Sequence, residues 1–194
     1  MRHLVVYCHP NPKSFNHAVK ETLAAEMRDW GHEVTVRDLY ELGFDPVLKS
    51  ADLSGSPCVD VKVEQGHVKA ADVITFVYPI WWTGLPARLK GYIDRVFSKG
   101  FAYDFGPQGL KGLLPDKRVM IFNTTGSPKP HYRQNGMFDA MNKASDEGIF
   151  AFCGMKVILH RYCCAVPFIS DAERKAMLDE VRQLAKTAEG IEMV

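Results

Sequence analysis

Short apolar runs alternate with amphipathic stretches along this chain of 194 residues. Such runs are typical of strands buried in a sheet, and they predict five strands, at residues 4–8, 33–39, 73–78, 118–122 and 156–159. Apolar positions that recur every three or four residues predict helices between these strands. The helices are expected at residues 15–30, 60–71, 86–97, 136–152 and 170–188.

The stretch between residues 40 and 59 carries neither pattern and is expected to be irregular. The segment after it, residues 60–71, has weak helical spacing, so we expect only one or two turns lying on the surface. Two helix starts are better marked. Pro86 suits a first helical turn, and the stretch from Ser170 to Glu173 is a capping box.

Strands that alternate with helices predict one parallel sheet with helices on both faces. The loop after the first strand, residues 9–16, contains no glycine and so lacks the Gly-x-Gly-x-x-Gly fingerprint of Rossmann dinucleotide-binding folds. The pattern favours an α/β fold of the flavodoxin-like kind, a doubly wound five-stranded parallel sheet with strand order 2-1-3-4-5. No repeat or linker divides the chain, and residues 1–194 are expected to form a single domain.

Composition narrows the class of protein. The chain is 46% apolar and 24% charged, as ordinary soluble domains are, and its net charge of +1 gives no reason to expect nucleic acid or an anionic membrane as a partner. No apolar run approaches the roughly 18 residues that a membrane-spanning helix needs. Five cysteines without a Cys-x-x-Cys motif, and a first strand without a preceding signal peptide, predict a cytoplasmic protein with no membrane insertion.

The strongest chemical signal is the loop that directly follows the third strand. It reads Pro79-Ile80-Trp81-Trp82-Thr83-Gly84-Leu85 and lies at the carboxyl edge, where open α/β sheets bind ligands. Two indoles are costly to place on a loop unless they cover something flat and apolar. Packing in the core or in a dimer interface would explain them equally well, but a planar aromatic cofactor is a hypothesis that the other loops can test.

Two further loops end at the same edge. Residues 9–16 precede a helix whose free N–H groups favour a phosphate, with Ser14 and Asn16 as additional donors. The other loop contains Thr124, Thr125 and Gly126, and the glycine permits close approach of the backbone to a ligand. Each loop alone has a plain explanation, as a helix cap or as a turn. Together the three loops predict a ligand that combines a phosphate with a flat ring.

Other chemistries find little support in the sequence. The histidines lack the spacing of metal ligands, so no metal site is expected. There is no Gly-x-Ser-x-Gly elbow that would supply a hydrolase nucleophile. Cys163 and Cys164 fit buried thiols better than a redox pair.

A set of short motifs follows one order along residues 1–165. The motifs are His9-Pro10, Ser14-Phe15-Asn16, Pro79-Ile80-Trp81-Trp82, Leu85-Pro86-Ala87, Asp94-Arg95-Val96-Phe97, Phe101-Ala102-Tyr103, Thr124-Thr125-Gly126 and Phe152-Cys153-Gly154. The ordered set resembles the NAD(P)H:quinone oxidoreductase family of flavodoxin-like flavoproteins. The resemblance implies a tightly bound flavin and a homodimer with sites near the subunit interface. It also implies a ping-pong cycle, in which the co-substrate NAD(P)H reduces the flavin and leaves before a quinone-like small molecule enters the same slot.

The resemblance also implies roles for individual residues. By family position, the flavin phosphate and ribityl chain would be held by His9, Ser14, Phe15 and Asn16. The isoalloxazine ring would be lined by Pro79, Ile80, Trp81 and Trp82, and its polar edge would be hydrogen-bonded by Thr124, Thr125 and Gly126. Tyr132 matches a family tyrosine near the flavin and the substrate.

The chain departs from the family pattern in two places. Members of the mammalian type carry a histidine six residues after that tyrosine, proposed to assist proton transfer, and this chain has Phe138 there. Tyr132, His131 or water would then take the catalytic proton-transfer role. Ser127 stands where a second glycine often follows Thr-Thr-Gly. The chain is also shorter than the FAD-binding mammalian members, which favours FMN over FAD.

Other functions stay open beside this one. Related small proteins are regulatory subunits of membrane transport systems, and nitro- and azoreductases share the mechanism with a different acceptor. A flavodoxin-type one-electron carrier is disfavoured, because such carriers usually dock through a strongly acidic surface that this balanced charge does not supply. The residues are compatible with either NADH or NADPH.

Overall fold

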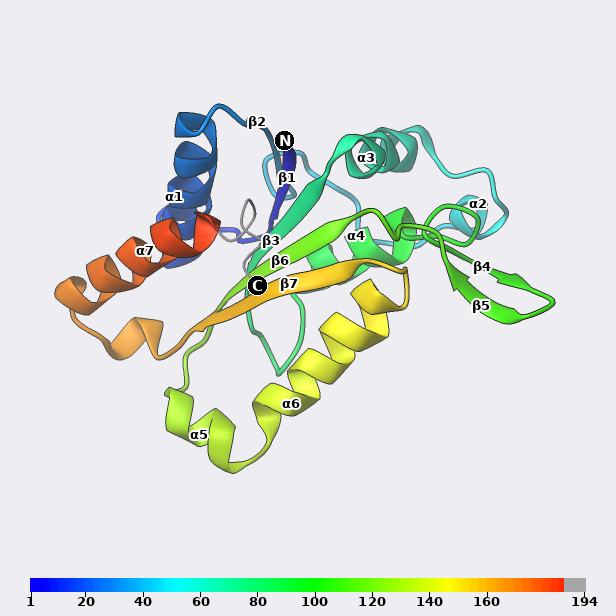
Figure 1. Cartoon of the computed structure of the whole chain (residues 1–194). Coiled ribbons are helices and arrows are strands. Elements are labelled where there is room, and N and C mark those ends of the chain that lie inside the picture. Colours follow the sequence, from blue (N-terminus) through cyan, green and yellow to red (C-terminus); the bar gives the residue numbers. More distant parts are fainter. Residues whose placement is uncertain (187–194) are drawn as a thin grey trace, which may run out of the picture.

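A five-stranded parallel sheet forms the centre of the structure, a computed structural model that describes residues 1–186. Its strands are β1 (Arg2–Tyr7), β2 (Glu33–Asp38), β3 (Val73–Pro79), β6 (Arg118–Thr124) and β7 (Lys156–Cys163). They lie in the order β2-β1-β3-β6-β7 (Figure 1). Counted along the chain within this sheet, that is the order 2-1-3-4-5, so the predicted doubly wound fold is confirmed.

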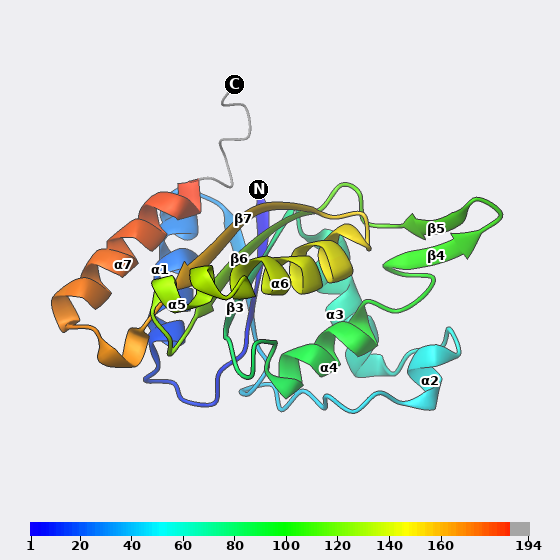
Figure 2. The same cartoon turned by 90° about the horizontal axis from the view of Figure 1, so that it is seen from below.

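Helices cover both faces of the sheet (Figures 1 and 2). One face carries α1 (Phe15–Asp29) and α7 (Asp171–Ala185), and the other carries α3 (Val59–Ala70), α4 (Ala87–Val96) and α6 (Met137–Asn142) with its continuation η1 (Lys143–Ala151). Side chains alternate between the faces along each strand. Leu4 and Val6 therefore join one apolar core, whereas Val5 and Tyr7 join the other. The whole of β3 is buried, as a strand in the middle of such a sheet must be.

The prediction for residues 60–71 was wrong in one respect, because α3 is a full helix of 12 residues rather than one or two surface turns. It buries Val61, Glu64 and Val68. A buried glutamate breaks the apolar spacing that marks a helix in a sequence. Arg37 on β2 compensates it, since its Nε donates to the Glu64 carboxylate at 3.1 Å.

Several short elements were not predicted. They are α2 (Ser50–Leu53), the hairpin of β4 (Tyr103–Gly106) and β5 (Gly109–Gly112), α5 (Lys129–Gln134) and the 3-10 turn η2 (Val166–Phe168). The hairpin projects away from the sheet and its helices (Figure 2). β7 also runs four residues beyond the predicted end at residue 159, and the predicted helix at 136–152 divides into α6 and the π-helix η1. Residues 187–194, including the predicted helical end at Ala188, lie outside the described residues.

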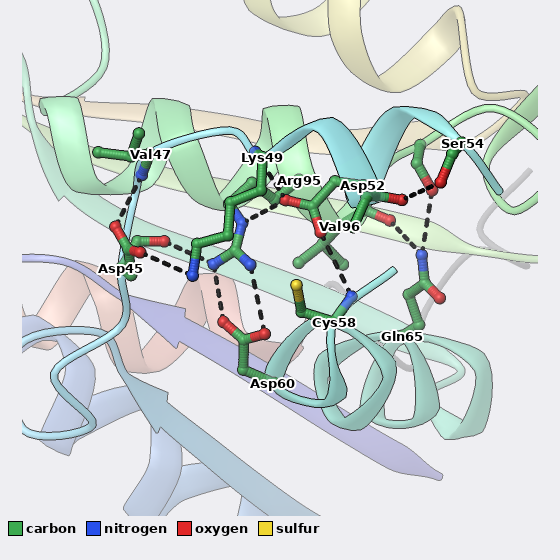
Figure 3. Close-up of polar contacts among 12 residues, drawn as sticks. Asp45, Val47, Lys49, Asp52, Ser54, Cys58, Asp60, Gln65, Arg95 and Val96 are labelled. Atoms are coloured by element: carbon green, nitrogen blue, oxygen red, sulfur yellow. Dashed lines mark hydrogen bonds and ion pairs between the residues drawn. The ribbon is translucent and has the colours of Figure 1, made fainter. Parts of the chain in front are cut away.

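The irregular segment between residues 40 and 59 is fastened by Arg95 on α4, which is fully buried (Figure 3). Its Nε donates to Asp52 at 2.7 Å, and its Nη1 donates to Asp60 at 2.7 Å and to the backbone carbonyl of Asp45 at 2.7 Å. The hydrogen bond from Arg95 lowers the pKa of Asp60. A buried guanidinium with several acceptors can replace regular secondary structure as the link between a loop and the core.

No helix within residues 1–186 is both long and apolar enough to cross a membrane. Over the same residues, no three His, Cys, Asp or Glu side chains gather in a group that could hold a metal ion.

Candidate functional site

Three loops at the carboxyl edge of the sheet surround one open hollow of about 440 Å³. The parallel register aligns the strand ends, since Pro79 on β3 lies opposite Thr124 on β6. The lining includes the predicted residues His9, Ser14, Phe15, Asn16, Pro79, Ile80, Trp81, Thr124, Thr125 and Gly126. Side chains that are more than 100 positions apart in sequence are thus brought to one place. Their roles toward a ligand stay predictions.

The first turn of α1 forms one wall of the hollow. Ser14 is the N-cap of this helix, and its Oγ accepts from the backbone N–H of His17 at 3.2 Å. The same oxygen lies 3.3 Å from the phenol oxygen of Tyr7. A cap and a ligand contact are compatible, because the N–H groups of the first turn and the helix dipole remain directed at this wall. The arrangement suits an anionic group such as a phosphate.

Asn16 carries an unsatisfied acceptor beside the hollow. Its side chain is buried, and its Nδ2 donates to Oγ1 of Thr124 at 2.7 Å. Its Oδ1 atom finds no hydrogen-bond partner among the described residues. Buried polar atoms are almost always hydrogen-bonded in folded proteins. A ligand that brings a donor, such as a hydroxyl group of a ribityl chain, fits this position.

His9 faces the hollow as a neutral donor. Burial lowers its pKa, which favours the uncharged imidazole. The backbone N–H of Asn11 donates to His9 Nδ1 at 3.0 Å, whereas the Asn11 carbonyl oxygen lies 3.3 Å from the same atom, and the shorter contact favours the tautomer with its proton on Nε2. The ring lies 5.8 Å from that of Trp81, and the two side chains form adjoining parts of the wall.

The tryptophan loop forms a tight turn, closed by hydrogen bonds in both directions between the backbones of Trp81 and Gly84, at 3.0 and 3.2 Å. Trp82 and Thr83 at its tip have φ angles of 51° and 62°. Such left-handed conformations cost non-glycine residues about 1–3 kcal/mol each and cluster at functional sites. Trp81 lines the hollow. Trp82 does not, because it occupies the tip of the turn and is fully exposed. In the single chain the side chain of Trp82 thus lies outside the hollow, and its contact with a ring stays a prediction.

The threonine loop is fixed by backbone hydrogen bonds to its neighbours. The N–H of Thr125 donates to the carbonyl of Cys163 at 2.9 Å, and the N–H of Ile80 donates to the carbonyl of Thr124 at 2.8 Å. The Thr125 hydroxyl donates to the Ser127 carbonyl at 2.9 Å. The Thr124 hydroxyl only accepts, from Asn16, so its own proton is free to bind a ligand.

Two lining residues, Val166 and Pro167, were missed by the sequence reasoning. They follow β7, which was predicted to end too early. Their backbone continues the pairing, since the N–H of Val166 donates to the Thr125 carbonyl at 3.1 Å. The sequence signal that could have predicted them is the short apolar segment with a proline that follows the strand.

The predicted catalytic pair lies beside the hollow rather than in it. Tyr132 on α5 packs against Phe138, with ring centroids 5.3 Å apart, and Phe138 packs against Tyr162 at 4.7 Å. Ile80 links the two places, because it lines the hollow and also packs against this aromatic cluster. His131 is exposed and lies near Asn135. Phe138 thus serves in packing.

Comparison with known proteins agrees with the fold. Residues 1–185 match the model of a family described by its flavodoxin-like fold. Over 188 residues the chain is 37% identical to an uncharacterized NAD(P)H oxidoreductase of Haemophilus influenzae, with 94% of this chain and 93% of that protein covered. The chain belongs to the flavodoxin-like NAD(P)H:quinone oxidoreductase family.

Other members of this family are quinone reductases by name. Ribosyldihydronicotinamide dehydrogenase [quinone] of Mus musculus is 32% identical over 208 residues, which cover 95% of this chain and 90% of that protein. The NAD(P)H:quinone oxidoreductase of Methanothermobacter marburgensis superposes with a TM-score of 0.87 at 26% identity and 97% coverage of both chains. This flavodoxin-like family member is therefore an oxidoreductase.

A more distant structure shares the fold alone. It is the FMN-dependent NADH-azoreductase of Bacillus anthracis, solved in complex with FMN. The TM-score is 0.73 at 17% identity, with 95% of this chain and 97% of that chain covered.

Proposed function

We propose that this protein is a flavin-dependent NAD(P)H:quinone oxidoreductase that moves two electrons, as hydride, from NAD(P)H to a quinone or a similar flat acceptor. The observation that carries the proposal is the shared hollow. It joins a helix N-terminus suited to a phosphate, a buried amide oxygen without a partner, and an aromatic loop beside two threonines. These are the parts that a phosphorylated, planar cofactor needs.

The residues of this chain would divide the work of holding the flavin. The phosphate would bind at the first turn of α1, with Ser14 and the Nε2–H of His9. Asn16 Oδ1 would accept from the ribityl chain, and the Thr124 hydroxyl would donate to the polar edge of the ring. A bound flavin would supply the hydride-transfer chemistry. The protein would supply orientation and exclude competing reactions.

We propose FMN rather than FAD as the cofactor. The hollow of about 440 Å³ opens to solvent and is lined by residues of the three loops and of η2. The azoreductase of the same fold is an FMN complex by its description. NAD(P)H would bind and leave before the acceptor enters the same slot. Tyr132, with His131 or water, would provide the proton that accompanies the hydride.

We further propose that the protein is a cytoplasmic homodimer. Phe105 and Leu110 are exposed on the projecting β4–β5 hairpin (Figure 2), and fully exposed Trp82 adds a third large apolar surface. A second copy would cover such side chains.

The cytoplasmic location is proposed from the thiols. All five cysteines are free, and burial raises the pKa of Cys8 to about 12 and that of Cys153 to about 11. Such thiols are unreactive and suit a reducing compartment.

The visible spectrum of the purified protein tests the function directly. We expect a flavin spectrum that anaerobic NADPH or NADH bleaches without a lasting semiquinone, and that a simple benzoquinone restores. A yellow protein that neither nucleotide bleaches would contradict the enzyme proposal and favour a regulatory or carrier role. An azo dye added as the oxidant in the same assay tests the azoreductase alternative. The shared fold of the Bacillus anthracis azoreductase favours this alternative.

A further inference from the structure

A buried network of polar side chains lies between η1 and the sheet, outside the residues that line the hollow. Its centre is His160 on β7, whose side chain is 7% exposed. The Nδ1 atom of His160 lies 2.9 Å from Oδ1 of Asp146 on η1, and its Nε2 atom lies 2.7 Å from Oδ1 of Asn123 on β6. Three elements of the fold therefore meet at one imidazole ring.

The partners of Asn123 decide which way its amide points. Its Nδ2 donates to the backbone carbonyl of Tyr78 at 3.2 Å, and a carbonyl can only accept. The Oδ1 atom of Asn123 therefore faces His160 as an acceptor. The Asp146 carboxylate is also an acceptor, so both ring nitrogens of His160 have to donate. Only the doubly protonated, positively charged imidazole satisfies this arrangement.

The network reaches the hollow through the strand ends. Asn123 directly precedes Thr124, and Tyr78 directly precedes Pro79, and both following residues line the hollow. Tyr78 and Asn123 are register partners across β3 and β6. The amide of Asn123 thus ties together the ends of two strands at the point where the tryptophan and threonine loops begin.

We propose that charged His160 is a positioning residue for the candidate flavin site, acting through Asn123 and the Tyr78 carbonyl. The identity of the ligand rests on the proposed function, but the positioning belongs to the chain alone. If the Nε2–H donor is removed, Oδ1 of Asn123 is left buried without its hydrogen bond, and the amide no longer holds the two strand ends in one arrangement. Flavin affinity therefore falls when this donor is lost.

The other titratable groups around the network are Asp146 on η1 and the phenols of Tyr78 on β3 and Tyr162 on β7. Tyr162 stacks on His160 with ring centroids 4.3 Å apart. Burial raises the pKa of both phenols, so they stay neutral. The Ser145 hydroxyl lies 2.6 Å from Oδ1 of Asp146 and 2.9 Å from the Met141 carbonyl oxygen, so these two acceptors share its one proton.

Nitrogen NMR of the flavin-free protein tests the positioning without any ligand. We expect both ring nitrogens of His160 to carry protons in the folded protein, as their two acceptors require. The backbone amides of Ile80 and Thr124 should shift in H160F, which keeps a ring of similar size and lacks both donors. Amides that stay in place in H160F would overturn the proposal, as would a His160 ring with a single proton.

Flavin binding supplies the second readout. We expect the Kd for FMN to rise roughly three- to tenfold in H160F, as loss of one charge-assisted hydrogen bond would cause. H160Q, whose amide can still donate to Asn123 Oδ1, should restore part of the affinity, while H67F, which changes a histidine outside the network, should leave the Kd unchanged. An unchanged Kd in H160F contradicts the proposal. Failure of FMN to bind to the parent protein would instead contradict the proposed function, and the amide shifts would still test the positioning.

Asp146→Asn provides an independent variant in case H160F does not fold. Removing the negative charge beside Nδ1 disfavours the doubly protonated ring. One ring nitrogen should therefore lose its proton in the nitrogen spectrum, and the amides of Ile80 and Thr124 should shift as in H160F. A ring that keeps both protons in the Asp146→Asn variant, or amides that stay in place, would overturn the proposal.

Discussion

Replacing Arg95 by methionine should destabilise the protein strongly, because it leaves a buried carboxylate without its partner. Arg95 and Asp52 are both fully buried, and their side chains are joined at 2.7 Å (Figure 3). Removal of one member of such a pair costs about 3–5 kcal/mol of the free energy of unfolding. Asp60 adds less, since its side chain is 43% exposed and water can replace the guanidinium. Against a total stability of about 5–15 kcal/mol, this loss is large.

Urea unfolding followed by tryptophan fluorescence measures the effect. Arg182→Met is the matched control, because Arg182 pairs with Asp179 on the surface of α7, and we expect it to cost less than about 1 kcal/mol. Adding Asp52→Asn to Arg95→Met should restore part of the stability, since the uncompensated charge is then gone. The reasoning is refuted if Arg95→Met costs no more than the control, or if the added Asp52→Asn destabilises further.

Four other predictions follow from single contacts. Gly91→Ala should cost several kcal/mol in urea unfolding, because the new Cβ would lie 2.1 Å from the Pro46 carbonyl oxygen; a neutral effect would mean that the loop can move away. Burial lowers the pKa of His3 to about 4, so the unfolded chain takes up a proton that the folded protein excludes. Stability should therefore fall, by up to about 3 kcal/mol, as the pH drops from about 6.5 to about 4. His3→Leu should flatten that part of the curve, and an unchanged acid limb would contradict the assignment. Asn16→Leu should weaken FMN binding at least tenfold by removing a buried acceptor and a donor, as fluorescence titration would show; equal affinity would place the ribityl chain elsewhere. Tyr132→Phe should lower kcat for quinone with FMN affinity unchanged, and a pH-rate profile identical to that of the parent would assign the proton to water or His131.

The sheet could be predicted from the sequence because its signal is local. Each central strand is buried on both faces, so a continuous apolar run marks it without any knowledge of its neighbours. The location of the site could be predicted for a related reason, since a parallel sheet places the carboxyl ends of all its strands at one edge. Residues as distant as Asn16 and Thr124 could thus be expected together, and a hydrogen bond of 2.7 Å joins them.

The tip of the tryptophan loop illustrates what local patterns miss. Trp81 and Trp82 are adjacent and chemically alike, yet one lines the hollow and the other is fully exposed. The difference arises from the left-handed backbone at Trp82 and Thr83, which no side-chain pattern encodes. Val166 and Pro167 were missed similarly, because their place depends on how far β7 continues its pairing with β6.

The largest gap between sequence and structure concerns buried charge. A hydropathy pattern assigns three buried residues, Glu64, Arg95 and His160, to the surface, because it does not show the groups that compensate their charge. The partners of Glu64 and Arg95 lie 27 and 43 positions away in the chain, and those of His160 lie on two other elements. In each case the polar residue fastens a segment that apolar packing alone leaves loose: α3, the irregular stretch after β2, and the ends of β3 and β6. A charged group in such a place adds little net stability compared with an apolar core, but it fixes one arrangement because its acceptors must be in position. The tryptophan and threonine loops start at the ends of β3 and β6, so fixing these strand ends also fixes the loops that line the hollow. For this reason we expect His160 to influence ligand binding although it lies outside the hollow.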